Sequence, residues 1–128
     1  AASYISLTDD ADTIRKKIMR AVTDSGQSVA FDPEKRPAIS NLLTIFHHAT
    51  GRHIKDVEAE FASKGYGEFK TALAEAVIAM LAPIQAKLNE YRKDPTELRK
   101  ILDAGRDAAS KLAGEKMKIV RELVGLGR

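Results

Sequence analysis

The sequence predicts an all-α protein, a compact bundle of about five helices. Apolar residues recur at helical spacing in five segments, and capping or breaking residues separate these segments. The chain has 128 residues, of which 44% are apolar and 30% are charged, and these values are typical of a folded globular domain. One domain of this size can bury a core without disulfides, and the sequence contains no cysteine.

The first helix is predicted to begin at Asp9 and Asp10, because carboxylates are good N-caps and favour the first turn. Ile14 and Ile18 then repeat at helical spacing. The helix should end in the polar stretch around Asp24. We expect Asp9, Asp10 and Asp24 to fix helix ends.

A connecting loop is predicted over residues 26–37, which are mostly polar and contain Pro33 and Pro37. This loop separates residues 1–25 from residues 38–128, which hold the remaining helices. We therefore expect the loop to act as a hinge.

Two helices are predicted between Pro37 and Phe61, with a break at Gly51. Their apolar residues are Ile39, Leu42, Leu43, Phe46 and Ala49 in the first helix, and Ile54, Val57 and Phe61 in the second.

A long helix is predicted to follow Gly65, where glycine allows the backbone to change direction. Its apolar residues are separated by three or four positions over six turns: Phe69, Leu73, Val77, Met80, Ile84, Leu88 and Tyr91. Pro83 lacks a backbone donor and clashes with the preceding turn, so we expect this long helix to be kinked at Pro83.

The last helix is predicted to begin at Pro95, with Asp94 as its N-cap, and to end near Gly125. One mostly apolar side is formed by Leu98, Ile101, Leu102, Gly105, Ala109, Leu112, Lys116, Ile119 and Leu123.

We expect neither catalytic residues nor a metal site in this chain. The sequence has no nucleophile elbow and no glycine-rich phosphate loop. His47 and His48 are adjacent, so their side chains would point about 100° apart on a helix, and His53 lies beyond the break at Gly51. These histidines are better explained as capping or half-buried residues.

Basic residues on the last two helices are the candidate RNA contacts. They are Lys87, Arg92, Lys93, Arg99, Lys100, Arg106 and Lys111. The formal net charge is only +3, and acidic residues lie near the basic ones. The residues by themselves therefore favour a solvated helical surface over an RNA groove.

Several short strings, each weak alone, occur in a fixed order between Tyr4 and Gly127. They are Ile5-Ser6-Leu7-Thr8-Asp9-Asp10, Lys16-Lys17-Ile18, Ala21-Val22-Thr23-Asp24-Ser25, Pro37-Ala38-Ile39-Ser40-Asn41-Leu42-Leu43, Lys64-Gly65-Tyr66-Gly67-Glu68-Phe69-Lys70, Leu81-Ala82-Pro83-Ile84 and the stretch from Gly105 to Ala113. Together they resemble the tryptophanyl-tRNA synthetases, a class I family of the bacterial type.

The resemblance implies an activity and its partners. Members of the family join tryptophan to ATP in a Rossmann-type domain and transfer the amino acid to tRNA(Trp). Their C-terminal helices, which this chain resembles, help to bind the tRNA anticodon and pivot against the catalytic domain. The resemblance thus implies that residues 1–25 continue from a catalytic domain and that residues 38–128 form the anticodon-binding domain.

The same resemblance sets the expected cofactors and surroundings. We expect no cofactor within these residues, and ATP and Mg in the full-length enzyme, which would be a homodimer. We expect a cytoplasmic protein that binds neither membrane nor DNA, because no apolar run reaches about 20 residues and the N-terminus lacks the pattern of a secretory signal.

The sequence departs from the family at two points. The H-I-G-H-like and K-M-S-K-S elements that handle ATP are absent, so we expect a fragment that is inactive by itself. Ala38 stands where many members carry glycine. The alternative function is a helical protein-protein interaction domain that does not bind RNA.

Overall fold

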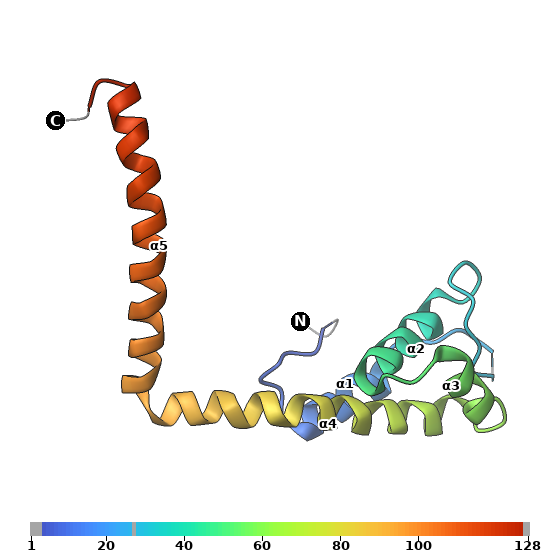
Figure 1. The fold of residues 1–128 in the computed structure, drawn as a ribbon. Coiled ribbons are helices and arrows are strands. Elements are labelled where there is room, and N and C mark those ends of the chain that lie inside the picture. Colours follow the sequence, from blue (N-terminus) through green and yellow to red (C-terminus); the bar gives the residue numbers. More distant parts are fainter. Residues whose placement is uncertain (1–3, 27, 127–128) are drawn as a thin grey trace. The chain divides into compact units, whose positions relative to one another are not determined.

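The computed structural model describes residues 4–26 and 28–126, and all of its regular structure is helical (Figure 1). The helices are α1 (Ala11–Arg20), α2 (Pro37–Thr50), α3 (Ile54–Phe61), α4 (Gly65–Lys93) and α5 (Pro95–Leu123). The predicted all-α class and the five helices are confirmed. Backbone contacts divide the chain into two units, Ala1–Ala86 and Lys87–Arg128, and each is described by itself.

The start of α1 is fixed by Asp10. Its carboxylate accepts a hydrogen bond from the Thr13 amide at 2.8 Å, which satisfies one of the free donors of the first turn. The helix ends at Arg20, earlier than the sequence predicts, and the Ala21 amide closes it by donating to the Ile18 carbonyl at 3.1 Å.

The other helix boundaries follow the local sequence closely. Gly51 ends α2 with φ of 73°, and Gly65 begins α4 with φ of 70°, a left-handed conformation that glycine adopts without a steric penalty. Before α5, the Asp94 carboxylate accepts a hydrogen bond from the Thr96 amide at 3.0 Å, and Pro95 occupies the first turn.

The core of the first unit is built from α1, α2, α3, α4 and one loop residue. Its buried residues are Ile14, Ile18, Val29, Ile39, Leu42, Leu43, Phe46, Val57, Phe61, Phe69, Leu73, Ala74, Val77 and Leu81. The ring centroid of Phe69 lies 5.8 Å from that of Phe46 on α2 and 5.5 Å from that of Phe61 on α3. These separations are favourable for aromatic pairs, so Phe69 joins three helices.

The predicted apolar stripe of α4 is only partly buried. Phe69, Leu73 and Val77 lie in the core as predicted, but the next buried residue is Leu81, whereas Met80 is 40% exposed. Residues spaced four positions apart shift only slowly around a helix. The buried residues of α4 follow this spacing from Phe69 to Leu81. Beyond Leu81 the helix contributes no residue to the core.

The helix α4 continues through Pro83 as far as Lys93. Proline therefore does not end the helix here, and the kink expected at Pro83 stays a prediction. By length and composition alone, α4 could also cross a membrane, and it is the one helix of the described residues that could. Its buried side chains, Phe69 to Leu81, pack against α1, α2 and α3 instead of standing free.

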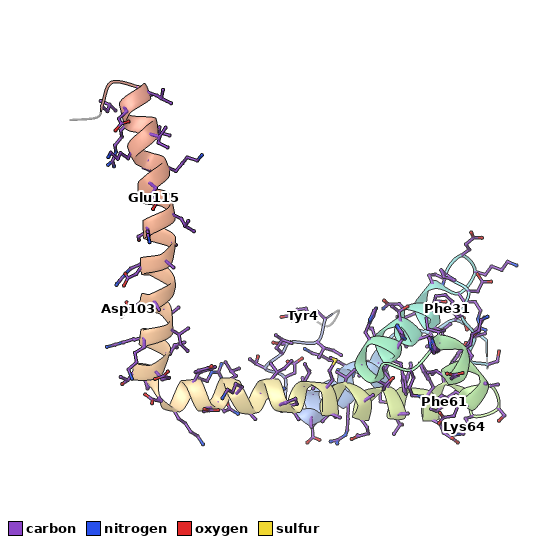
Figure 2. All side chains as sticks on the ribbon, viewed as in Figure 1. Tyr4, Phe31, Phe61, Lys64, Asp103 and Glu115 are labelled. Atoms are coloured by element: carbon purple, nitrogen blue, oxygen red, sulfur yellow. The ribbon has the colours of Figure 1, made fainter. Side chains whose placement is uncertain are left out.

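The helix α5 lies in the second unit and is described by itself. None of its residues is buried. Figure 2 shows side chains along the whole length of α5, with Asp103 and Glu115 labelled. The compact bundle of the first unit consists of α1, α2, α3 and the part of α4 as far as Leu81.

Shortening Leu73 should destabilise the first unit, because the side chain is fully buried and its removal leaves a cavity. We expect Leu73→Ala to lower the free energy of unfolding by about 2–5 kcal/mol, measured by urea denaturation. The matched control is Leu112→Ala on α5, where the side chain is 73% exposed. This change should cost less than about 0.5 kcal/mol, and equal losses in the two variants would contradict the described core.

Candidate functional site

Three polar side chains from separate parts of the first unit meet in one place, which we call the loop cluster: Asp24, Arg36 and Tyr66. Arg36 Nε donates to Asp24 Oδ2 at 2.7 Å, and Arg36 Nη2 donates to the Ser28 carbonyl at 2.6 Å. The Tyr66 hydroxyl donates to Asp24 Oδ1 and accepts from Arg36 Nη2. The cluster thus joins the loop after α1 to the start of α4.

The helices position the side chains of the loop cluster. Arg36 is the last residue before α2, and Tyr66 is the second residue of α4. Asp24 lies in the loop and is 12 residues from Arg36 and 42 residues from Tyr66 in sequence. No local periodicity links positions so far apart, so only the packing of α2 and α4 on the core brings them together.

The loop cluster shifts the protonation equilibria of its members. The Arg36 guanidinium, followed by the Tyr66 hydroxyl, holds the pKa of Asp24 well below its usual range. The pKa of Tyr66 is raised, first by partial burial and then by its hydrogen bond to Asp24. Because each group is engaged by the others, the cluster fixes the backbone and leaves no free nucleophile or base.

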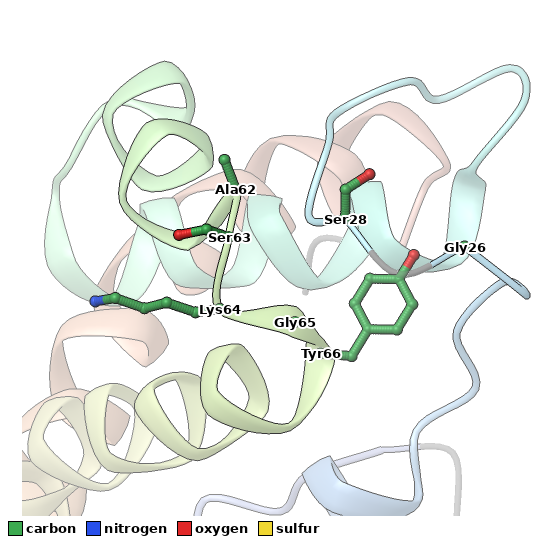
Figure 3. A pocket seen from close by; sticks show the side chains of 7 residues that line it. All are labelled: Gly26, Ser28, Ala62, Ser63, Lys64, Gly65 and Tyr66. Atoms are coloured by element: carbon green, nitrogen blue, oxygen red, sulfur yellow. The ribbon is translucent and has the colours of Figure 1, made fainter.

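Gly26 packs directly against the loop cluster. A Cβ at this position would lie 2.8 Å from Arg36 Nη2 and 2.9 Å from Asp24 Oδ1, closer than real Cβ contacts allow. Figure 3 shows Tyr66 extending from the start of α4 toward the loop that carries Gly26 and Ser28. An open pocket of about 490 Å³ is lined by Gly26, Ser28, Ala62, Ser63, Lys64, Gly65 and Tyr66.

Two further side chains of α4 fasten the N-terminal segment. Lys70 is buried, and its Nζ donates to the Ala21 carbonyl at 2.7 Å, beyond the end of α1. A cation at a helix C-terminus satisfies free carbonyls and suits the helix dipole. Gln85 Nε2 donates to the carbonyls of Leu7 at 3.0 Å and Asp9 at 2.9 Å.

Asp9 fixes the entry to α1. Its carboxylate accepts hydrogen bonds from the Ser6 amide at 2.8 Å and from Lys17 Nζ at 2.6 Å. These bonds, that of Lys17 first, lower the pKa of Asp9. The pKa of Asp10 is also lowered, mainly by the amide of Thr13. Of the three predicted capping residues, Asp10 is the N-cap, Asp9 braces the preceding turn, and Asp24 lies in the loop cluster.

The loop predicted to be a hinge is anchored at several points. Val29 is buried in the core. The Phe31 amide donates to Glu58 Oε1 on α3 at 2.6 Å, and the Asp32 amide donates to Ser40 Oγ on α2 at 2.9 Å. In this structure the loop is held against the helices that follow it, and its role as a hinge stays a prediction.

The seven candidate RNA contacts are all exposed, but three of them form ion pairs. Lys87 pairs with Glu90 at 2.8 Å, Lys100 pairs with Glu97 at 3.4 Å, and Arg106 pairs with Asp103 at 2.9 Å. The other four form no ion pair with any residue in the described ranges 4–26 and 28–126: Arg92, Lys93, Arg99 and Lys111.

The basic residues of α5 do not form a single stripe. At about 100° per residue, Arg99 and Arg106 lie about 20° apart on one flank. Lys100 and Lys111 lie together on another flank, about 100° or more from the arginines. A polyanion lying along one side of α5 would therefore meet one of these pairs at a time.

The three histidines make local contacts around the end of α2. His47 Nδ1 lies 2.6 Å from the Arg52 carbonyl, a hydrogen-bonding distance across the turn at Gly51. The ring of His48 lies tilted against that of His47, with ring centroids 5.0 Å apart, and His53 is the residue before α3. Across the described part of the chain, no three potential metal ligands come together.

Residues 1–82 match the family model described as tRNA synthetases class I (W and Y). The chain therefore belongs to this family of class I synthetases. It is 48% identical over 126 residues to the tryptophan–tRNA ligase of Halalkalibacterium halodurans and 44% identical over 126 residues to that of Bacillus subtilis. The match covers 98% of this chain but only 38% of the length of each of these relatives.

Solved structures of the family contain the same fold. The chain superposes on the tryptophanyl-tRNA synthetase of Mycoplasma pneumoniae with a TM-score of 0.83 at 28% identity, over 99% of this chain and 40% of that one. The synthetase of Campylobacter jejuni gives a TM-score of 0.72 at 32% identity, over 95% of this chain and 38% of that one. The resemblance identified from the short strings is thus confirmed.

Sequence reasoning missed four residues that hold the site together: Arg36, Tyr66, Lys70 and Gln85. Tyr66 and Lys70 belong to the string Lys64–Lys70, so the sequence marked the segment without showing its contacts. Arg36 directly precedes another string, and Gln85 had no signal at all. Their partners are distant in sequence, and no spacing rule reaches that far.

The loop cluster should make the stability of the first unit depend on pH. The depressed pKa of Asp24 means that its contribution is complete above the unfolded value of about 3.9 and is lost as the pH falls toward the lower folded value. We expect Asp24→Asn to lower the melting temperature by several degrees at pH 7, and the difference from the parent to shrink below about pH 4. Asp12→Asn, at an exposed position on α1, is the control and should melt like the parent throughout. A gap between Asp24→Asn and the parent that persists unchanged at pH 2.5 would contradict the assigned pairing.

Proposed function

We propose that this chain is the C-terminal, helical, tRNA-contacting portion of a tryptophan–tRNA ligase. The complete protein would charge tRNA(Trp) with tryptophan at the expense of ATP. Support comes from relatives that are 44–48% identical over nearly the whole chain and are tryptophan–tRNA ligases. The chain spans 38% of their length, so the remainder of such a protein would supply the reaction.

One observation carries the proposal. Two of the strings that resemble the family meet in space at the loop cluster, because Asp24 and Tyr66 come from different strings, and Arg36 directly precedes a third. Lys70, from the same string as Tyr66, holds the end of α1. Some of the residues that carry the resemblance therefore also fix the arrangement of helices in the first unit.

The proposed parts follow the chain. Residues 1–25 continue from the catalytic part, residues 26–37 form the hinge loop, and residues 38–128 contact the tRNA. Movement at the hinge would require Asp24 to release Arg36, since this pair ties the loop to the start of α2. The loop cluster would then stabilise one of two hinge positions, the one in which Asp24 and Arg36 are paired.

The proposed RNA contacts are the basic residues on α4 and α5. Arg92, Lys93, Arg99 and Lys111 would contribute most, because a residue already paired with a carboxylate must break that pair to meet a phosphate. Lys87, Lys100 and Arg106 would contribute less, since their acidic neighbours lie within 2.8 to 3.4 Å.

The chain's own residues do not suit ATP or Mg. Metal ions of this kind prefer several carboxylate oxygens, but no suitable group of three ligands occurs among the described residues, and Asp9 and Asp10 are engaged with Lys17 and Thr13. No step of the reaction is therefore assigned to these 128 residues. They would bind, orient and move the tRNA.

Removal of two unpaired cations should weaken tRNA binding. We expect the double variant Arg92→Ala and Lys93→Ala to bind a tRNA(Trp) transcript more weakly and to lower the slope of log affinity against log salt by about two, about one for each lost phosphate contact. Filter binding between 50 and 300 mM salt would measure this slope.

The matched control removes two positive charges from the first unit, with Lys35→Ala and Lys55→Ala. This control should keep the parent slope. If the parent itself shows no preference for tRNA and no salt dependence, the chain is a protein-binding helical domain that does not contact RNA.

The 128-residue chain should not form an aminoacyl adenylate. We expect no tryptophan-dependent exchange of pyrophosphate into ATP with this chain, and restored exchange when the chain replaces the matching 38% of the Halalkalibacterium halodurans ligase. Exchange by the 128 residues alone would overturn the proposed division of labour.

A further inference from the structure

A turn formed by residues 6–9, which we call the entry turn, leads the chain into α1. The Asp9 amide donates to the Ser6 carbonyl at 3.1 Å, and the Ser6 amide donates to the Asp9 carboxylate at 2.8 Å. Two hydrogen bonds between the same two residues close the turn on itself. The entry turn therefore keeps its own shape, and other groups decide where it lies against the helices.

One side chain from each of two helices holds the entry turn. Lys17 of α1 donates from Nζ to the Asp9 carboxylate at 2.6 Å. Gln85 of α4 donates from Nε2 to the carbonyls of Leu7 at 3.0 Å and Asp9 at 2.9 Å. A primary amide has two N–H groups, so one side chain satisfies both carbonyls. Because both carbonyls must point at the same nitrogen, Gln85 fixes the position and the rotation of the turn.

The two anchors of the entry turn differ in how far they reach along the chain. Lys17 is eight residues from Asp9, on the helix that directly follows the turn. Gln85 is 78 residues from Leu7 and 76 residues from Asp9. The contact of Lys17 therefore moves together with α1, whereas the contact of Gln85 ties the turn to a distant helix of the first unit.

Gln85 lies beyond the end of the apolar core. The last core residue of α4 is Leu81, one turn earlier, and the Gln85 side chain is half-buried. Its bond to the Leu7 carbonyl is exposed. Water replaces much of the energy of a hydrogen bond at such a place, so the bond adds little to the net stability of the fold. Gln85 therefore acts on the position of the entry turn more than on folding.

The entry turn connects α1 to the residues that precede it. Ile5 packs against the core, and the ring of the exposed Tyr4 lies 5.0 Å from Lys17 Nζ. The path of the chain at residue 4 thus depends on where the entry turn lies. We infer that Gln85 is a positioning residue, which sets the catalytic part of the longer protein against the helices of the first unit through the entry turn. The inference rests on the proposed function, in which residues 1–25 continue from that part.

Amide exchange in the 128-residue chain tests whether Gln85 holds the entry turn. Gln85→Met removes both donors and keeps a side chain of similar length. We expect exchange in residues 6–9 to become at least about fivefold faster, because a turn with one anchor opens more often. The melting temperature should change by no more than about 3 °C, since the core is untouched.

Two further variants separate the bond from a general effect on the helix. Gln85→Lys restores donors for the same carbonyls, because an ammonium group has three N–H bonds. It should bring exchange in residues 6–9 back toward the parent rate. Asn89→Leu, the matched control, removes an exposed amide one turn further along α4 and should leave that rate unchanged.

The same variants are then measured in the Halalkalibacterium halodurans ligase in which this chain replaces the matching 126 residues. Gln85→Met should lower kcat/KM for tryptophan-dependent pyrophosphate exchange about tenfold, because a small displacement of reacting groups slows a reaction strongly. Part of this loss should be a higher KM for ATP or for tryptophan. Partial unfolding would instead lower kcat alone, since fewer molecules would be active. Gln85→Lys should recover most of the loss, and Asn89→Leu should match the parent.

The failure of the inference and that of the proposed function give different results. If the parent chimera exchanges pyrophosphate and Gln85→Met exchanges equally well, the inference is wrong and the proposed function stands. Unchanged amide exchange in residues 6–9 would also overturn the inference, because Gln85 would then not hold the turn. So would a loss that Gln85→Lys does not recover or that Asn89→Leu shares. A parent chimera without exchange would overturn the proposed function and the inference together.

Discussion

The arrangement of the first unit depends on the packing of Phe69 between Phe46 and Phe61. Phe69 is fully buried and fixes the rotation of α4 about its axis. Tyr66 and Lys70 lie on the same side of this helix, three residues before and one residue after Phe69. Once Phe69 is in place, the hydroxyl of Tyr66 therefore meets Asp24, and the ammonium of Lys70 meets the end of α1. A hydrophobic contact thus sets up the polar contacts of Tyr66 and Lys70.

The polar contacts in turn restrain a segment that would otherwise be free. The loop after α1 has no regular structure, and Arg36, Glu58 and Ser40 hold it through hydrogen bonds to its backbone or to Asp24. Each of these groups comes from a helix or a helix end that the core already positions. The loop is therefore held in place by groups that the core positions. If the pair of Asp24 and Arg36 opens, this part of the loop loses its restraint while the core stays folded.

The helix of the second unit differs from those of the first in its burial. Whereas α4 buries its apolar face within this chain as far as Leu81, α5 buries none of its residues. Its sequence places most charged residues and most apolar residues on different sides of the helix.

The sequence by itself determined the helices, because their limits depend on neighbouring residues. Asp10, Gly51, Asp94 and Pro95 act within one turn, and the spacing of apolar residues is also local. The strings identified the family for a similar reason, since each string is local and their order along the chain is a property of the sequence. Tertiary structure alone decided that Leu81 and not Met80 is buried, and that Asp24 meets Arg36 and Tyr66. These outcomes depend on which helices touch, and contacts between residues 12 to 42 positions apart leave no periodic trace in the sequence.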